Sequence, residues 1–112
     1  MPIEMKLDKR KMIRKAEEFN KIFQDGERFS SAFLILVSRQ SISGKFGFAV
    51  SKKIKGAVRR NRAKRKIREI VRLNQNVLPD NKNVILMAKP GTDRRQFQSL
   101  NREFLSLLEK IK

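Results

Sequence analysis

The sequence KFGFAVSKKIKGAVRRNRAKRKIREIVRLN, residues 45–74, contains the pattern that decides the fold. Over residues 45–52, large apolar side chains alternate with small ones, which predicts a strand with two unlike faces. Over residues 57–74 the apolar side chains recur every three or four positions, which predicts a long helix that ends before Pro79. We therefore expect a strand followed directly by a strongly basic helix.

One face of this helix is apolar and should pack on a sheet. On a helical wheel that face is formed by Ala63, Ile67, Ile70, Val71 and Asn74. A stripe beside it is formed by Asn61, Lys64, Arg65, Arg68 and Arg72, and a far-side set by Arg59, Arg62 and Lys66. We expect the stripe at the edge of the core and the far-side set in solvent, so that the helix meets a ligand on two sides.

The residues on either side of this stretch predict the rest of an α+β domain. The same two periodicities indicate a helix over residues 7–25, strands over residues 32–38 and 83–88, and a closing helix over residues 93–111. The expected fold class is a small two-layer sandwich, in which helices pack on one central, mostly antiparallel sheet of about four strands. A short extra strand near Phe29 or Ile54 would fit this order.

The charge of the chain points to a polyanionic partner. Its 112 residues suffice for one domain, residues 1–112, with a single modest core. Lys and Arg number 28 against 11 Asp and Glu, which gives a formal net charge of +17. So much like charge repels itself in a compact fold, and a polyanion would relieve that repulsion. The alternative is a basic protein without such a partner.

The sequence offers little for catalysis or for holding a metal. It contains no histidine and no cysteine, so the commonest general base and the thiolate metal ligands are missing. No carboxylate occurs between Arg28 and Arg68, whereas a two-metal nuclease needs several together. We expect no catalytic residue and no metal site in the protein, and we expect any linked hydrolysis to be performed by another component.

Membrane and export signals are also lacking. The longest apolar run, residues 32–37, is far shorter than the roughly 20 residues that span a bilayer. The first residues do not resemble a secretory signal. We expect a soluble cytoplasmic protein with no membrane partner.

The start of the basic helix is a candidate phosphate-binding site. Arg59 and Arg60 lie in its first turn, where the helix dipole makes each cation cost roughly 0.3–1 kcal/mol. Cations and free backbone N–H groups together favour an anion there, and Gly56 would let a phosphate approach the backbone. Lys52 and Lys53, at the strand end, are further candidates. The alternative is a solvated charged face, but such a face usually mixes both signs.

The order of residues in this segment resembles a known family. SKKIKGAVRRNRAKRKIRE, residues 51–69, is similar to the arginine-rich signature of the bacterial ribonuclease P protein family. Arg60-Asn61-Arg62 matches the family's central element, and residues 46–53 resemble its central strand. Phe19 and Phe23 match its aromatic pair. Three departures are Gly56 directly before the helix, Ala63 in place of a larger aliphatic residue, and Leu36 where some relatives carry a tyrosine.

The resemblance implies a function. Proteins of this family bind a catalytic RNA that, with magnesium held mainly by the RNA, cleaves the 5′ leader from precursor tRNA. The protein would be the accessory subunit of this endoribonuclease, with ribonuclease P RNA and precursor tRNA as partners. A left-handed β-α-β crossover is implied as well, against the usual right-handed rule.

The resemblance also implies two groups of site residues. The RNA- and phosphate-binding group is Lys52, Lys53, Arg59, Arg60, Asn61, Arg62, Lys64, Arg65 and Arg68. The leader-binding cleft is Phe19, Phe23, Leu36, Ala49 and Ser51.

Other readings of the same residues remain open. Two phenylalanines four apart on a helix are more often core residues than a base-stacking platform. A ribosomal or general RNA-binding protein would explain the charge but leaves the signature as coincidence. A helix-in-groove DNA binder is disfavoured, because strands flank the basic helix where a second helix would be needed. We expect no DNA partner.

Overall fold

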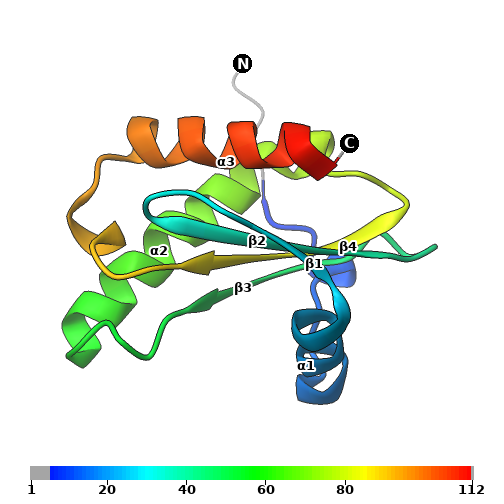
Figure 1. Ribbon diagram of the computed structural model, residues 1–112, viewed down its shortest axis with the longest axis horizontal. Coiled ribbons are helices and arrows are strands. Elements are labelled where there is room, and N and C mark those ends of the chain that lie inside the picture. The colour runs from blue at the N-terminus through cyan, green and yellow to red at the C-terminus, as the bar shows by residue number, and fades with distance from the viewer. Residues whose placement is uncertain (1–5, 112) are drawn as a thin grey trace.

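The computed structural model describes residues 6–111. Its helices and strands are α1 (Ala16–Asp25), β1 (Glu27–Ser30), β2 (Leu34–Gln40), β3 (Phe46–Val50), α2 (Ala57–Asn74), β4 (Lys82–Ala88) and α3 (Phe97–Ile111), with short 3-10 turns η1 (Lys9–Lys11), η2 (Gln75–Val77) and η3 (Thr92–Arg94). The strands form one sheet in the order β1-β2-β4-β3 (Figure 1). Among the strand pairs of the described residues, β3–β4 alone is parallel, so the α+β class and the mostly antiparallel sheet are confirmed.

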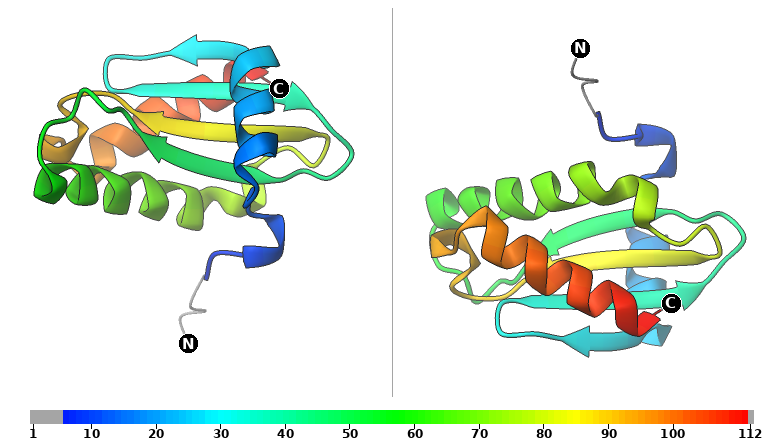
Figure 2. Two further views of the ribbon diagram at one scale, coloured as in Figure 1. Left: turned by 90° about the horizontal axis from the view of Figure 1, so that it is seen from below. Right: turned by 90° about the horizontal axis from the view of Figure 1, so that it is seen from above.

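Helices lie on both faces of this sheet. α2 and α3 cover one face, and α1 crosses the other (Figure 2). The main core lies between the sheet and the helices α2 and α3, where Leu36, Ile67 and Phe104 are fully buried. A smaller cluster under α1 includes Ile22 and Val37. The two clusters take alternate strand residues because successive side chains of a strand point to opposite faces.

The connection from β3 through α2 to β4 has the uncommon hand. Seen from the side of α2 and α3, both strands point to the left, β4 lies below β3, and α2 runs back along the β3 edge (Figure 2, right). The buried side chains of α2 join those of α3 in the main core, so α2 lies on the near side of the sheet in this view. This is a left-handed crossover between parallel neighbours. The family resemblance implied it, and the general preference for right-handed connections would not have predicted it.

The prediction of a helix over residues 7–25 is right only in its second half. α1 begins at Ala16, and the residues before it run extended on both sides of η1. Met12 forms a parallel bridge to Phe46, and the Ile13 N–H donates to the Phe46 carbonyl oxygen at 2.8 Å. The free edge of β3 thus binds backbone groups that a helix would have used internally.

The closing helix begins at Phe97, not at residue 93. Asp93 lies in η3 and is drawn into an ion pair with Arg59 of α2. The predicted bounds of α2 are confirmed, and those of the three predicted strands shift by one to two residues. The extra strand is present at Phe29, in β1, whereas Ile54 is a buried core residue outside the strands. No helix within residues 6–111 is long and apolar enough to cross a membrane.

Candidate nucleic-acid interface

The basic stripe of α2 lies on the surface as predicted. Ala63, Ile67, Ile70 and Val71 are buried against the sheet and α3. The stripe beside them has its first four members exposed: Asn61, Lys64, Arg65 and Arg68. Its last member, Arg72, is half-buried and donates from Nε to Glu69 Oε2 at 3.1 Å. At 1.5 Å per residue, the 18-residue helix presents this stripe over about 27 Å.

A shallow hollow opens on the same side of α2. It has a volume of about 240 Å³ and is lined by Val58, Asn61, Arg62 and Arg65. Three of its four side chains are donors and two of them are cations. Guanidinium groups bind the oxygens of a phosphate through paired hydrogen bonds, so the hollow suits the backbone of a nucleic acid.

The start of α2 is open to an anion. Gly56 precedes the helix with φ +90°, a conformation that favours glycine, and no side chain caps the first turn. The first turn carries no acid. Arg60 turns back to donate from Nη1 to the Ile54 carbonyl oxygen at 3.1 Å, which ties the helix start to the preceding turn. Free backbone N–H groups and the helix dipole therefore remain available for a phosphate.

The far-side set of α2 does not face solvent as a group, and that prediction is wrong for two of its members. Arg59 donates from Nε to Oδ2 of the buried Asp93 at 3.0 Å. Lys66 donates from Nζ to the Asp93 carbonyl oxygen at 2.9 Å and also to that of Arg95. Only Arg62 of this set is exposed. The expected closing helix would have left Asp93 in solvent, whereas η3 brings it onto α2.

The Asp93–Arg59 pair predicts a pH dependence of stability. The hydrogen bond from Arg59 lowers the pKa of the Asp93 carboxyl below its ordinary value. Such a group stabilises the fold above its unfolded pKa of about 3.9, and this contribution is lost as the pH falls through the lower folded pKa. We expect Asp93→Asn to lower the free energy of unfolding by about 1–2 kcal/mol at pH 7 and by less at pH 2.

Urea unfolding of both proteins at the two pH values measures this difference. The control is Asp80→Asn, which removes an exposed carboxylate before β4. An Asp93→Asn effect that is equal at pH 7 and pH 2 would contradict the role of the charge.

The aromatic pair lies on the other face of the sheet. The rings of Phe19 and Phe23 are 6.3 Å apart between centroids and nearly parallel, at 10°. Phe19 lies over Gly47, where a Cβ atom would come within 3.4 Å of its ring. The Arg28 guanidinium lies 4.3 Å from the centroid of the Phe23 ring. Both phenylalanines pack on the smaller cluster and are only half-buried, so they contribute to the core and keep a part of their surface exposed.

Beside α1 the sheet presents a row of side chains on this face. The strand register brings together Ala49 of β3, Met87 of β4, Ile35 of β2 and Ser30 of β1. We call these four residues the cross-strand row. Ala49, Met87 and Ile35 are half-buried and Ser30 is exposed, so a ligand can reach the row. Ala49 thus lies on the same face of the sheet as Gly47, over which Phe19 packs, and its part in a leader-binding cleft stays a prediction.

The prediction that Leu36 lines the leader-binding cleft is wrong. Its side chain is fully buried in the main core, on the opposite face from Phe19 and Phe23. A shift of one residue along a strand moves a side chain to the other face of the sheet. Ile35 takes the place that Leu36 was expected to have. Sequence reasoning missed Ile35 and Met87, because β2 and β4 are apolar on both faces and lack the alternation that would have marked them.

Ser51 stabilises a turn at the end of β3, and its place in a leader-binding cleft stays a prediction. It is 9% exposed, and its Oγ accepts the Lys53 N–H at 3.2 Å. This turn leaves Lys52 and Lys53 exposed between β3 and α2. Both lysines therefore lie where the strand that carries Ala49 meets the start of the basic helix.

Side chains that commonly bind metals are dispersed over the described residues. Within residues 6–111 no group of three or more His, Cys, Asp and Glu side chains gathers as an ion would need. Hydrogen bonds from arginine hold the pKa values of Asp8 and Glu69 below their ordinary values, Arg10 for the first and Arg72 for the second. These carboxylates are engaged in ion pairs within the protein.

Comparison with known proteins agrees with this geometry. The model of the family described as Ribonuclease P matches residues 7–112. The chain belongs to the ribonuclease P protein family. The ribonuclease P protein component of Syntrophomonas wolfei is 35% identical over 93% of this chain and 89% of its own length. That of Syntrophus aciditrophicus is 38% identical over the same shares.

Solved ribonuclease P proteins share the fold. The protein from Thermotoga maritima superposes with a TM-score of 0.76 at 26% identity, over 90% of this chain and 97% of its own. The protein from Staphylococcus aureus gives a TM-score of 0.75 at 24% identity, over 91% and 95%. This chain therefore shares its α+β architecture with both of these proteins.

Proposed function

We propose that this chain is the protein subunit of a ribonuclease P and that it binds the catalytic RNA through α2. The observation that carries the proposal is the exposed stripe on α2, which displays Asn61, Lys64, Arg65 and Arg68 of the family's arginine-rich signature on one side of a helix whose other side is core. Lysine and arginine contacts to phosphates supply most of the affinity of such interfaces and make it depend on salt.

The second part of the proposal is that the α1 face of the sheet binds the 5′ leader of precursor tRNA. Phe19 and Phe23 offer partly exposed rings next to the cross-strand row. Unpaired bases stack on aromatic rings with little dependence on sequence, so a leader of varied sequence could be held there. Lys52 and Lys53 would contact its phosphates on the way to α2.

The chemistry of leader removal would belong to the RNA and its magnesium ions. The chain has no histidine or cysteine, and the acids described above are paired or scattered. Divalent ions bound by RNA can activate water and stabilise the leaving oxygen without protein ligands. The protein would act in the cytoplasm by positioning the substrate and reducing charge repulsion between two large RNAs. Membership of the family disfavours the alternative of a ribosomal or general RNA-binding protein.

Reconstitution tests this proposal directly. The purified chain should not cleave precursor tRNA, because it lacks catalytic groups. Added to a ribonuclease P RNA, it should lower several-fold the magnesium concentration needed for cleavage, since its net charge of +17 replaces part of the counterion requirement. Cleavage is followed on end-labelled precursor tRNA over a magnesium series. No change in the magnesium requirement would contradict the proposal.

A further inference from the structure

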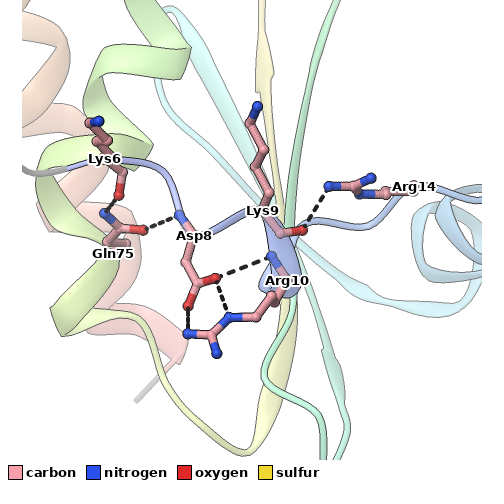
Figure 3. A network of polar contacts seen from close by, with 6 residues as sticks. All are labelled: Lys6, Asp8, Lys9, Arg10, Arg14 and Gln75. Carbon is pink, nitrogen blue, oxygen red and sulfur yellow. Dashed lines mark hydrogen bonds and ion pairs between the residues drawn. The ribbon is translucent and has the colours of Figure 1, made fainter.

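A basic segment ahead of α1 is fixed against the end of α2. We call residues 6–15 the N-terminal strap. Gln75, directly after α2, donates from Nε2 to the Lys6 carbonyl oxygen at 2.5 Å and accepts the Asp8 N–H on Oε1 at 3.0 Å (Figure 3). Leu7 packs on the main core, and Met12 pairs with β3. The strap is therefore held by side-chain, core and backbone contacts.

A large open hollow lies between the strap and α2. Its volume is about 780 Å³. Its basic lining residues come from both elements: Lys6, Lys9, Arg10, Arg68 and Arg72. Two acids also line it, and each is bound to an arginine: Asp8 Oδ1 to Arg10 Nε at 3.1 Å, and Glu69 to Arg72. Five cations and two acids leave a net charge of +3, and the two pairs orient their guanidinium groups.

The positive surface continues on the other side of the strap. A second hollow of about 410 Å³ shares Lys9 and Arg10 with the first and adds Arg14, Lys15 and Lys45. One acid, Glu18, also lines it and is paired with Lys45 at 3.6 Å, so cations still predominate. Arg14 donates from Nη2 to the Lys9 carbonyl oxygen at 3.3 Å, which keeps the strap compact (Figure 3). Because Arg68 and Arg72 end the stripe of α2 and also line the first hollow, stripe and strap form one continuous basic surface.

We propose that the N-terminal strap and the end of α2 form a second binding site for the sugar-phosphate backbone of the catalytic RNA. The inference rests on the proposed function and extends it. Two broad, open hollows rimmed by cations suit a polyanion that runs across them, and they offer no enclosed apolar pocket for a small molecule. The surface continues the α2 stripe and not the cross-strand row, which favours the catalytic RNA over the leader. Gln75 is the residue that positions the N-terminal strap beside α2, through its hydrogen bonds to Lys6 and Asp8.

Removing two strap charges tests the site. Lys6 and Lys9 are exposed and each is replaced by alanine in Lys6→Ala/Lys9→Ala. The affinity of the full chain for ribonuclease P RNA should fall about tenfold at moderate salt. The slope of log K against log salt should shrink by about 2, one unit for each lost phosphate contact. The matched control is Arg102→Ala/Lys110→Ala, which removes two exposed cations from α3.

A second variant tests the strap's position without changing charge. Gln75→Ala should weaken RNA binding several-fold and speed amide exchange at Asp8, whose N–H loses its acceptor. Gln98→Ala, on the exposed side of α3, should do neither. Circular dichroism should show both variants folded.

Three results would overturn the inference. One is a strap variant with the same affinity and salt slope as the α3 control. Another is a Gln75→Ala protein that frees the Asp8 amide but binds RNA normally. The third is a strap defect confined to precursor tRNA that carries a leader, which would assign the strap to the substrate. Failure of the wild-type chain to stimulate the RNA would instead refute the proposed function, so the two failures are distinguishable.

Discussion

Leu36→Ala is expected to lower the free energy of unfolding by about 2–5 kcal/mol, because it leaves a cavity in the main core. Leu36 is fully buried between the sheet and the helices α2 and α3. Ile35→Ala should cost about 1 kcal/mol, since Ile35 is half-buried at the edge of the smaller cluster and its loss exposes little new surface. Urea unfolding of the two variants measures the difference between neighbouring residues of one strand.

The same pair separates stability from leader binding. Under conditions where both variants are folded, Ile35→Ala should weaken holoenzyme binding of precursor tRNA with a leader but leave binding of leaderless tRNA unchanged. Leu36→Ala should affect both substrates equally or neither, because its side chain faces away from the leader. If Leu36→Ala alone impaired leader binding, the assignment of the cross-strand row would be wrong.

Arg65→Ala is expected to weaken binding to ribonuclease P RNA about tenfold and to reduce the salt slope by about 1. Asn61→Ala should weaken binding without changing that slope, because an amide hydrogen bond releases no counterion. The double variant should bind ribonuclease P RNA up to about a hundredfold more weakly, since both side chains line one hollow on α2. Filter binding or fluorescence anisotropy over a salt series measures both quantities.

The fold should be intact in these variants. Asn61 and Arg65 are exposed, and neither faces the core. The matched controls on α3 are Gln98→Ala for the amide and Arg102→Ala for the cation, and neither should change RNA binding. Loss of helix signal in circular dichroism, or an equal loss of affinity in the controls, would contradict the role assigned to this side of α2.

Much of the architecture could be predicted locally. The bounds of α2 follow from a single strong helical periodicity, and the alternation over residues 45–52 gives both faces of β3 correctly. Those patterns work because each element buries one side against the same core, which forces a period of 3.6 or 2 on its sequence. The prediction that α2 binds phosphate rests on unbalanced charge, which needs no knowledge of packing.

The structural predictions that were wrong share one cause. Met12, Asp93 and Leu36 were misplaced because their surroundings are set by residues distant in the chain. Met12 pairs with the edge of β3 instead of lying in a helix, and Asp93 lies in η3, paired with Arg59. Leu36 is buried in the main core. In an apolar strand the sequence alone does not say which face is inward, and a one-residue error exchanges the core for the binding surface.

The sequence by itself determined the class of fold and the basic helix, and it predicts a polyanionic partner, because periodicity and net charge are local or additive properties. Only the tertiary structure decided which cations also have partners within the protein. Arg65 is exposed, whereas Arg59 is paired with Asp93, and Gln75 holds the N-terminal strap beside the end of α2. Such choices depend on contacts between residues up to 69 positions apart, which no local pattern encodes.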